Sequence, residues 1–197
     1  MYYKLNLILT YFSPAISFLL IEGLLLFQIF KKRLPSLKNL KILLQIFITF
    51  LIIFAIFLSV LNYYAWKQND ISKHLLPPFA SITYILHYSW QHYLFEPVIV
   101  ILVALLAFWL IKLLNQKFKN TFFYDEEPYL AALGILATSW PNCLIFLSLV
   151  LFLGVISHFV VKEKRFPLLY FWLPCALLVL LLSGIISKYL IINQFVI

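Results

Sequence analysis

The sequence has little glycine and few charged residues. Only four of its 197 residues are glycine, and only 11% are charged. It contains no Gly-rich phosphate loop, no nucleophile-elbow serine and no His-Glu-x-x-His motif. Because a nucleotide cradle needs glycines where the backbone approaches the phosphates, this scarcity argues against a nucleotide-dependent enzyme. Soluble domains carry about 25% charged residues, so the low charge also argues against a soluble fold.

Side chains that bind metals or form disulfides are also scarce. The two cysteines, Cys143 and Cys175, both lie in apolar segments, which favours buried free thiols over a disulfide. Among the four histidines, His87 and His92 lie five residues apart, whereas ligands on one helix face are three or four residues apart. We therefore expect neither a metal site nor a cofactor.

What the chain does contain is apolar sequence, since 64% of its residues are hydrophobic. This bias extends from end to end, so a signal peptide does not explain it. The pattern predicts an all-α fold: one domain, residues 1–197, forming a polytopic membrane bundle of about six transmembrane helices. The apolar runs cover residues 5–30, 40–64, 97–114, 128–140, 143–161 and 167–186.

Two segments depart from a simple series of spans. The run 128–140 is too short for a ~30 Å hydrocarbon core, so we expect it inside the bundle or in a thinned bilayer. Residues 75–90 are apolar but contain Pro77, Pro78, His87 and several aromatic residues, which predicts an interfacial or re-entrant segment.

The positions of the basic residues predict the orientation. With six spans and the loop after the first span in the cytoplasm, eleven Lys and Arg residues lie inside and four outside, as the positive-inside rule requires. This places the protein in the inner (cytoplasmic) membrane with both termini outside, and the lipid bilayer explains the basic charge without a nucleic-acid partner. The inside set is Lys31, Lys32, Arg33, Lys38, Lys41, Lys112, Lys117, Lys119, Lys162, Lys164 and Arg165; the outside set is Lys4, Lys67, Lys73 and Lys188.

The acidic residues that could carry chemistry lie within or beside the apolar runs. Glu22 lies inside the first run and Glu96 directly precedes the third, where ionisable groups are costly and suggest a function. Glu22 could equally be a protonated or paired carboxyl that faces the bundle interior. Asp125, Glu126 and Glu127 precede Pro128, a pattern that also suits an ordinary helix N-terminus.

Four stretches, in order, carry a resemblance to a known family. They are Gln-Ile-Phe-Lys-Lys-Arg-Leu-Pro-Ser-Leu at 28–37, the apolar run 98–114 with a basic linker at 115–120, Glu-Glu-Pro-Tyr-Leu-Ala-Ala-Leu-Gly at 126–134 followed by Trp140, and Arg-Phe-Pro-Leu-Leu-Tyr-Phe at 165–171. Together they resemble the type IV prepilin leader peptidases, which are membrane aspartic proteases. The resemblance implies a multi-pass core, a cytoplasmic site, and a pilin-like transmembrane helix or secretion-system subunits as partners.

The departures from this family concern its catalytic positions. The first family aspartate falls on Gln28 and the second on Glu126, while the two motif glycines fall on Phe123 and Asp125. Aspartic proteolysis needs one ionised and one protonated carboxyl group, and the amide of Gln28 cannot take a proton from water. The resemblance therefore implies a catalytically impaired member that acts in or beside a pilus or secretion pathway.

Two other functions remain open. An active endopeptidase would use Glu126 with another acid, either Glu22 or Asp125. A small transporter or channel subunit would use Glu22 and Glu96 as polar sites within the membrane, although the chain shows none of the internal repeats that are common in transporters.

Overall fold

The computed structural model describes residues 2–31, 35–118, 123–161 and 167–189, and these residues form helices and turns with no strand. The long helices are α1 (Tyr2–Lys31), α2 (Leu37–Gln68), α4 (Phe95–Lys117), α6 (Asn142–Val161) and α7 (Trp172–Tyr189). The shorter elements are the 3₁₀ turn η1 (Ser72–Leu75), α3 (Ile82–Ser89), the π-turn η2 (Trp90–Leu94), α5 (Glu127–Thr138) and the 3₁₀ turn η3 (Pro167–Tyr170). The all-α prediction is confirmed for the described residues.

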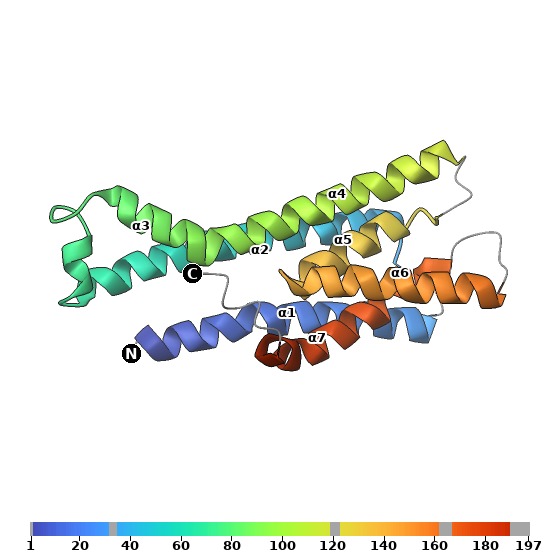
Figure 1. The fold of residues 1–197 in the computed structure, drawn as a ribbon, viewed down its shortest axis with the longest axis horizontal. Coiled ribbons are helices and arrows are strands. Elements are labelled where there is room, and N and C mark those ends of the chain that lie inside the picture. Colours follow the sequence, from blue (N-terminus) through green and yellow to red (C-terminus); the bar gives the residue numbers. More distant parts are fainter. Residues whose placement is uncertain (1, 32–34, 119–122, 162–166, 190–197) are drawn as a thin grey trace.

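The short helix α5 lies at the centre of the elongated bundle (Figure 1). It packs against α4, α7, α2, α6 and α1, and every one of its residues except Tyr129 is buried. Its sequence is apolar on all sides, as a helix surrounded by other helices requires. The prediction that the run 128–140 forms a short helix inside a bundle is therefore confirmed.

The sequence predicted an interfacial or re-entrant segment at residues 75–90, and in the structure residues 82–90 of this segment are continuous with the third long helix. From Ile82 the chain is helical without interruption through α3, η2 and α4 to Lys117. The third long helix thus begins fifteen residues before Pro97, and it bends at η2 (Figure 1). Pro97 has no amide hydrogen for the carbonyl one turn earlier, which explains why the helix is irregular at this point.

Within the described residues, two helices are long and apolar enough to cross a membrane. They are α2 and the continuous helix Ile82–Lys117, with lengths of 32 and 36 residues. Shorter apolar helical stretches cover Pro14–Phe30, Asn142–Ser157 and Leu168–Ser183. Over the part of the chain that the structure describes, there are thus six principal helices in the predicted order.

One end of the bundle collects several helix ends and most of the described basic residues. The last turns of α1, α4 and α6 and the first turns of α2 and α5 lie together at this end (Figure 1). We call it the basic end, because Lys38 and Lys41 near the start of α2 and Lys112 and Lys117 near the end of α4 lie there. The predicted inside residues at 32, 33, 119, 162, 164 and 165 lie outside the described residues.

The opposite end carries a local ion pair instead of a basic cluster. Lys73 Nζ lies 2.7 Å from Asp70 Oδ1 in the turn that follows α2. The hydrogen bond and the positive charge from Lys73 lower the pKa of the exposed Asp70 carboxyl below its ordinary value. An exposed pair of this kind contributes little to stability. The informative feature is therefore the difference in charge between the two ends of the bundle.

The contact between α5 and α6 predicts the effect of a single added methyl group. Gly134 on α5 faces the ring of Phe146 on α6, both are fully buried, and a Cβ at Gly134 would overlap three atoms of that ring. We expect Gly134→Ala to destabilise the protein by about 1–3 kcal/mol through overpacking. Thermal unfolding in detergent should show a lower Tm.

Gly23→Ala is the matched control, because Gly23 on α1 has no atom within 4 Å of the added Cβ. It should leave the Tm unchanged or raise it, since alanine favours a helix more than glycine does. Adding Phe146→Leu to Gly134→Ala should recover part of the loss. Equal Tm values for Gly134→Ala and Gly23→Ala would contradict the close packing of α5 against α6.

Candidate functional site

The turn that leads from α4 into α5 is held by two buried polar side chains. Asn115 Oδ1 accepts a hydrogen bond from the Phe123 amide at 3.1 Å, and Glu127 Oε1 accepts one from the Tyr124 amide at 3.4 Å. Asn115 is 5% exposed and Glu127 is 0% exposed. The Glu127 amide donates back to the Tyr124 carbonyl at 3.1 Å. These bonds fix the position at which α5 enters the bundle.

The three consecutive acids at the start of α5 have different environments. Asp125 is exposed, Glu126 is half-buried and Glu127 is fully buried. Glu126 is the N-cap residue, and its backbone carbonyl accepts from the Tyr129 and Leu130 amides at 3.1 Å each. Its side chain makes no capping hydrogen bond, so the carboxyl group is available to bind another group. Acids in the first turn suit the positive end of the helix dipole, as the sequence interpretation allowed.

A cavity of about 310 Å³ opens beside this turn. The carboxylate of Asp125 and the ammonium of Lys112 both line it, and the Lys112 Nζ lies 5.7 Å from the centre of the Phe108 ring. Of the four predicted site residues, Asp125 alone lines this cavity. The full lining is Leu37, Phe108, Lys112, Asn115, Gln116, Asp125, Pro128 and Tyr129.

Gln28 and Glu22, the predicted site residues on α1, are both half-buried. Gln28 lies in the last turn of α1, at the same end of the bundle as the start of α5, and α1 packs directly against α5 (Figure 1). Glu22 lies six residues earlier, which is ~9 Å along the helix axis. Neither residue lines the cavity beside Asp125 or the larger cavity described next.

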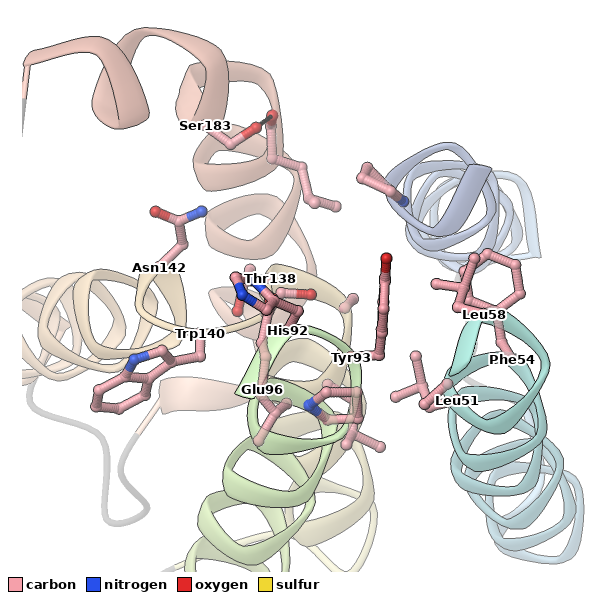
Figure 2. A pocket seen from close by; sticks show the side chains of 18 of the residues that line it. Leu51, Phe54, Leu58, His92, Tyr93, Glu96, Thr138, Trp140, Asn142 and Ser183 are labelled. Atoms are coloured by element: carbon pink, nitrogen blue, oxygen red, sulfur yellow. Dashed lines mark hydrogen bonds between the residues drawn. The ribbon is translucent and has the colours of Figure 1, made fainter. Parts of the chain in front are cut away.

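The sequence interpretation missed a larger cavity at the other end of α5. It measures about 440 Å³ and lies between α2, the η2–α4 bend, the end of α5 and α7. Figure 2 shows Glu96, His92 and Tyr93 on the bent helix, with Leu51, Phe54 and Leu58 of α2 across from Tyr93. The remaining labelled side chains are Thr138, Trp140, Asn142 and Ser183.

A spacing in the sequence could have revealed this cavity. Tyr88, His92, Glu96 and Val100 recur at intervals of four and all line it, as residues on one helix face do. The pattern was hidden because the helix was expected to begin only at Pro97. The histidine spacing that was considered instead, His87 to His92, joins two different faces.

The end of α5 at this cavity has an unusual backbone. Ser139 has φ 61° and ψ 171°, a conformation that costs non-glycine residues of the order of 1–3 kcal/mol. It terminates α5, while its carbonyl accepts from the Cys143 amide at 2.8 Å and so starts α6. The Thr138 hydroxyl donates to the Gly134 and Ile135 carbonyls at 2.9 and 3.2 Å. The surrounding hydrogen bonds therefore stabilise the strained conformation of Ser139, which lines the cavity.

The described residues contain no group of three or more His, Cys, Asp or Glu side chains that could hold a metal ion. Buried Cys143 and Cys175 lie on α6 and α7 as free thiols. The side chains that line the cavities at the two ends of α5 offer carboxylates, amides, hydroxyls, aromatic rings, the ammonium of Lys112 and the imidazole of His92.

The role of Asn115 in the turn gives a second prediction. Asn115→Ala removes the acceptor of the Phe123 amide, a net loss of about 1 kcal/mol for a typical hydrogen bond. We expect roughly five- to tenfold faster amide exchange over residues 123–127, measured by hydrogen–deuterium exchange. Gln116→Ala, which changes the exposed neighbour on the same helix, should leave this exchange unaltered. Equal protection in both variants would show that Asn115 does not hold the turn.

Comparison with known proteins finds no family model that matches the chain, no similar curated protein and no similar solved structure. Function is therefore inferred from the residues and from the geometry around the two ends of α5.

Proposed function

We propose that the chain is a multi-pass membrane protein whose basic end faces the cytoplasm. In the most apolar windows of α2 and of the Ile82–Lys117 helix, only 22% and 11% of residues are buried. The core helix of a soluble protein would be mostly buried, and both helices lie too far into the chain to be signal sequences. Lipid is the solvent that suits apolar surface of this extent.

The orientation is supported by the charges at the two ends of the bundle. The four described lysines of the basic end lie near the ends of α2 and α4, where they would meet the headgroups and the cytoplasm. Lys67 and Lys73 at the opposite end are fewer, and Lys73 is paired with Asp70. In this arrangement six helices cross or enter the bilayer, with α5 enclosed by the others.

Within that membrane we propose a prepilin-peptidase-like core without normal proteolysis. The observation that carries this proposal is the packing of α1 against α5, which brings the last turn of α1 to the same end of the bundle as the start of α5. A family of this type would keep one acid on each of these helices. Here α1 presents the amide of Gln28, while Glu127 on α5 is buried in the turn.

The chemistry that remains suits binding better than hydrolysis. A half-buried carboxyl at Glu126 and an amide at Gln28 supply hydrogen-bond partners, whereas aspartic proteolysis needs two carboxyls that share the proton transfers. We infer that the partner is a pilin-like transmembrane helix or a membrane subunit of a pilus or secretion assembly. Such a partner reaches the basic end laterally through lipid.

A cleavage assay tests this function. The protein in detergent, mixed with a prepilin-type substrate, should bind the substrate without removing its leader. Loss of one member of a catalytic pair costs several orders of magnitude in rate. Gln28→Asp combined with Glu126→Asp should restore measurable cleavage, whereas Glu126→Asp alone, which still lacks the second carboxyl, should not.

Glu22→Gln is the matched control, because it changes another carboxyl of α1 that lies about 9 Å from Gln28 along the helix. It should affect neither substrate binding nor the activity of the double variant. Leader removal by the unmodified protein that Glu126→Gln abolishes would overturn the non-catalytic proposal and favour the endopeptidase. Absence of substrate binding would refute the proposal that a pilin-like helix is the partner.

Cysteine labelling tests the orientation. The native thiols of Cys143 and Cys175 are buried, so a membrane-impermeant maleimide should report only introduced sites. In intact cells we expect labelling of Ile71→Cys. We expect no labelling of Ser36→Cys or Gln116→Cys until the membrane is permeabilised. All three native residues are exposed. The reverse pattern would invert the topology.

A further inference from the structure

The larger cavity presents an acid and several aromatic rings on one helix face. Tyr88, His92 and Glu96 follow one another at four-residue intervals, and the rings of Tyr88 and His92 lie 4.2 Å apart between centroids. The ring of Trp66 on α2 packs behind Tyr88 at 4.7 Å. Tyr93 lines the cavity from the neighbouring row of the same helix, opposite α2 (Figure 2).

Glu96 is the one carboxylate among the described residues that line this cavity, and no lysine or arginine lines it with Glu96. The Glu96 carboxyl forms no ion pair or hydrogen bond with the described residues. Within the proposed topology this acid lies inside a membrane helix, where an unpaired charge is costly and marks a functional site. Apart from the imidazole of His92, one turn earlier on the same face, none of the described lining residues can supply a positive charge, so the site is complementary to a cation from outside the protein.

The other lining groups indicate which class of cation the cavity would bind. Hard metal ions such as Ca²⁺ take six to eight oxygen ligands, and one carboxylate with scattered hydroxyls does not provide them. Aromatic faces attract organic cations instead, as in the cages that bind quaternary ammonium groups. The rings of Phe54, Tyr88, Tyr93 and Trp140 line the cavity, together with the apolar side chains of Leu51, Leu58 and Leu136.

The backbone around the cavity is built for this arrangement. The π-turn at Trp90–Leu94 places the adjacent residues His92 and Tyr93 on the same cavity wall, and single π-turns within α-helices are frequent at functional sites. Pro97 has no amide hydrogen to donate to the carbonyl of Tyr93, one turn earlier. The strained Ser139 also lines the cavity.

We propose that this cavity is a binding site for an organic ammonium group, with Glu96 as its counter-ion and Tyr88, Tyr93 and Trp140 as its aromatic wall. Its volume of about 440 Å³ falls within the ~300–1,000 Å³ typical of ligand sites. The ammonium belongs either to a free hydrophobic amine or to a lipid headgroup, and the chemistry of recognition is the same. The site lies at the opposite end of α5 from Glu126, so it stands or fails independently of the proposed prepilin-like core.

Direct binding tests the proposal with the full chain in nanodiscs of phosphatidylglycerol, which has no ammonium headgroup. Radiolabelled choline is measured by equilibrium dialysis and challenged with 3,3-dimethylbutan-1-ol, its neutral isostere, and with tetrapropylammonium as a larger cation. We expect saturable choline binding, competition by tetrapropylammonium, and at least tenfold weaker competition by the neutral isostere. Comparable competition by the isostere, or no saturable binding of either cation, would overturn the proposal.

Two matched pairs of variants assign the site to its residues. Glu96→Gln should weaken choline binding at least tenfold, whereas Glu22→Gln, another acid within the proposed membrane spans, should leave it unchanged. Tyr93→Leu should weaken binding, and Tyr93→Phe, which keeps the ring, should retain it. An unaltered Tm verifies that each variant is folded. Unchanged binding in a folded Glu96→Gln variant would exclude Glu96 as the counter-ion and refute the site.

A change of lipid identifies the source of the ammonium. If the lipid headgroup occupies the site, nanodiscs that contain phosphatidylcholine should weaken choline binding at least tenfold relative to phosphatidylglycerol alone. If the natural ligand is a free amine, the two preparations should bind choline equally. Either result supports ammonium recognition, and the two results separate its sources.

Discussion

The constraint on which the fold depends is the length of α5. Twelve residues at 1.5 Å each span about 18 Å, well short of a ~30 Å hydrocarbon core. In the proposed membrane topology, both ends of such a helix leave backbone groups inside the protein, where lipid cannot satisfy them. The other helices must therefore enclose α5 and supply partners at each end. This requirement explains why both candidate sites lie at the ends of α5.

The two ends meet this requirement differently. At the start, buried Glu127 and Asn115 bind the amides of the preceding turn, so the polar groups are used within the protein. At the C-terminal end, the Thr138 hydroxyl donates a hydrogen bond to the Gly134 carbonyl of the same helix, and Ser139 turns the chain in a strained conformation. The space left beside that corner is not filled by apolar side chains. A cavity with a carboxylate thus remains where the chain leaves α5.

The sequence predicted those features that depend on the length of its apolar runs. The six runs, the order of the helices and the short buried helix follow from hydropathy, because burial and lipid exposure both select apolar residues. The start of the third helix was wrong by fifteen residues, because Pro77, Pro78 and the aromatic residues mask a helix that begins at Ile82. Sequence alone also could not separate Glu126 from Glu127, since one residue of helical rotation decides which acid is buried.

The contrast between Glu127 and Glu96 argues that the two ends of α5 serve different purposes. Glu127 is the first residue of α5, and both its side chain and its amide form hydrogen bonds with the backbone of Tyr124, so its burial has a structural reason. Glu96 belongs to no such turn and faces a cavity with aromatic walls. Removing it would leave the bonds that define the fold intact, so stability does not require an acid there. In the proposed membrane topology, a carboxylate inside a helix without a structural role is best explained by a cationic ligand that enters the cavity.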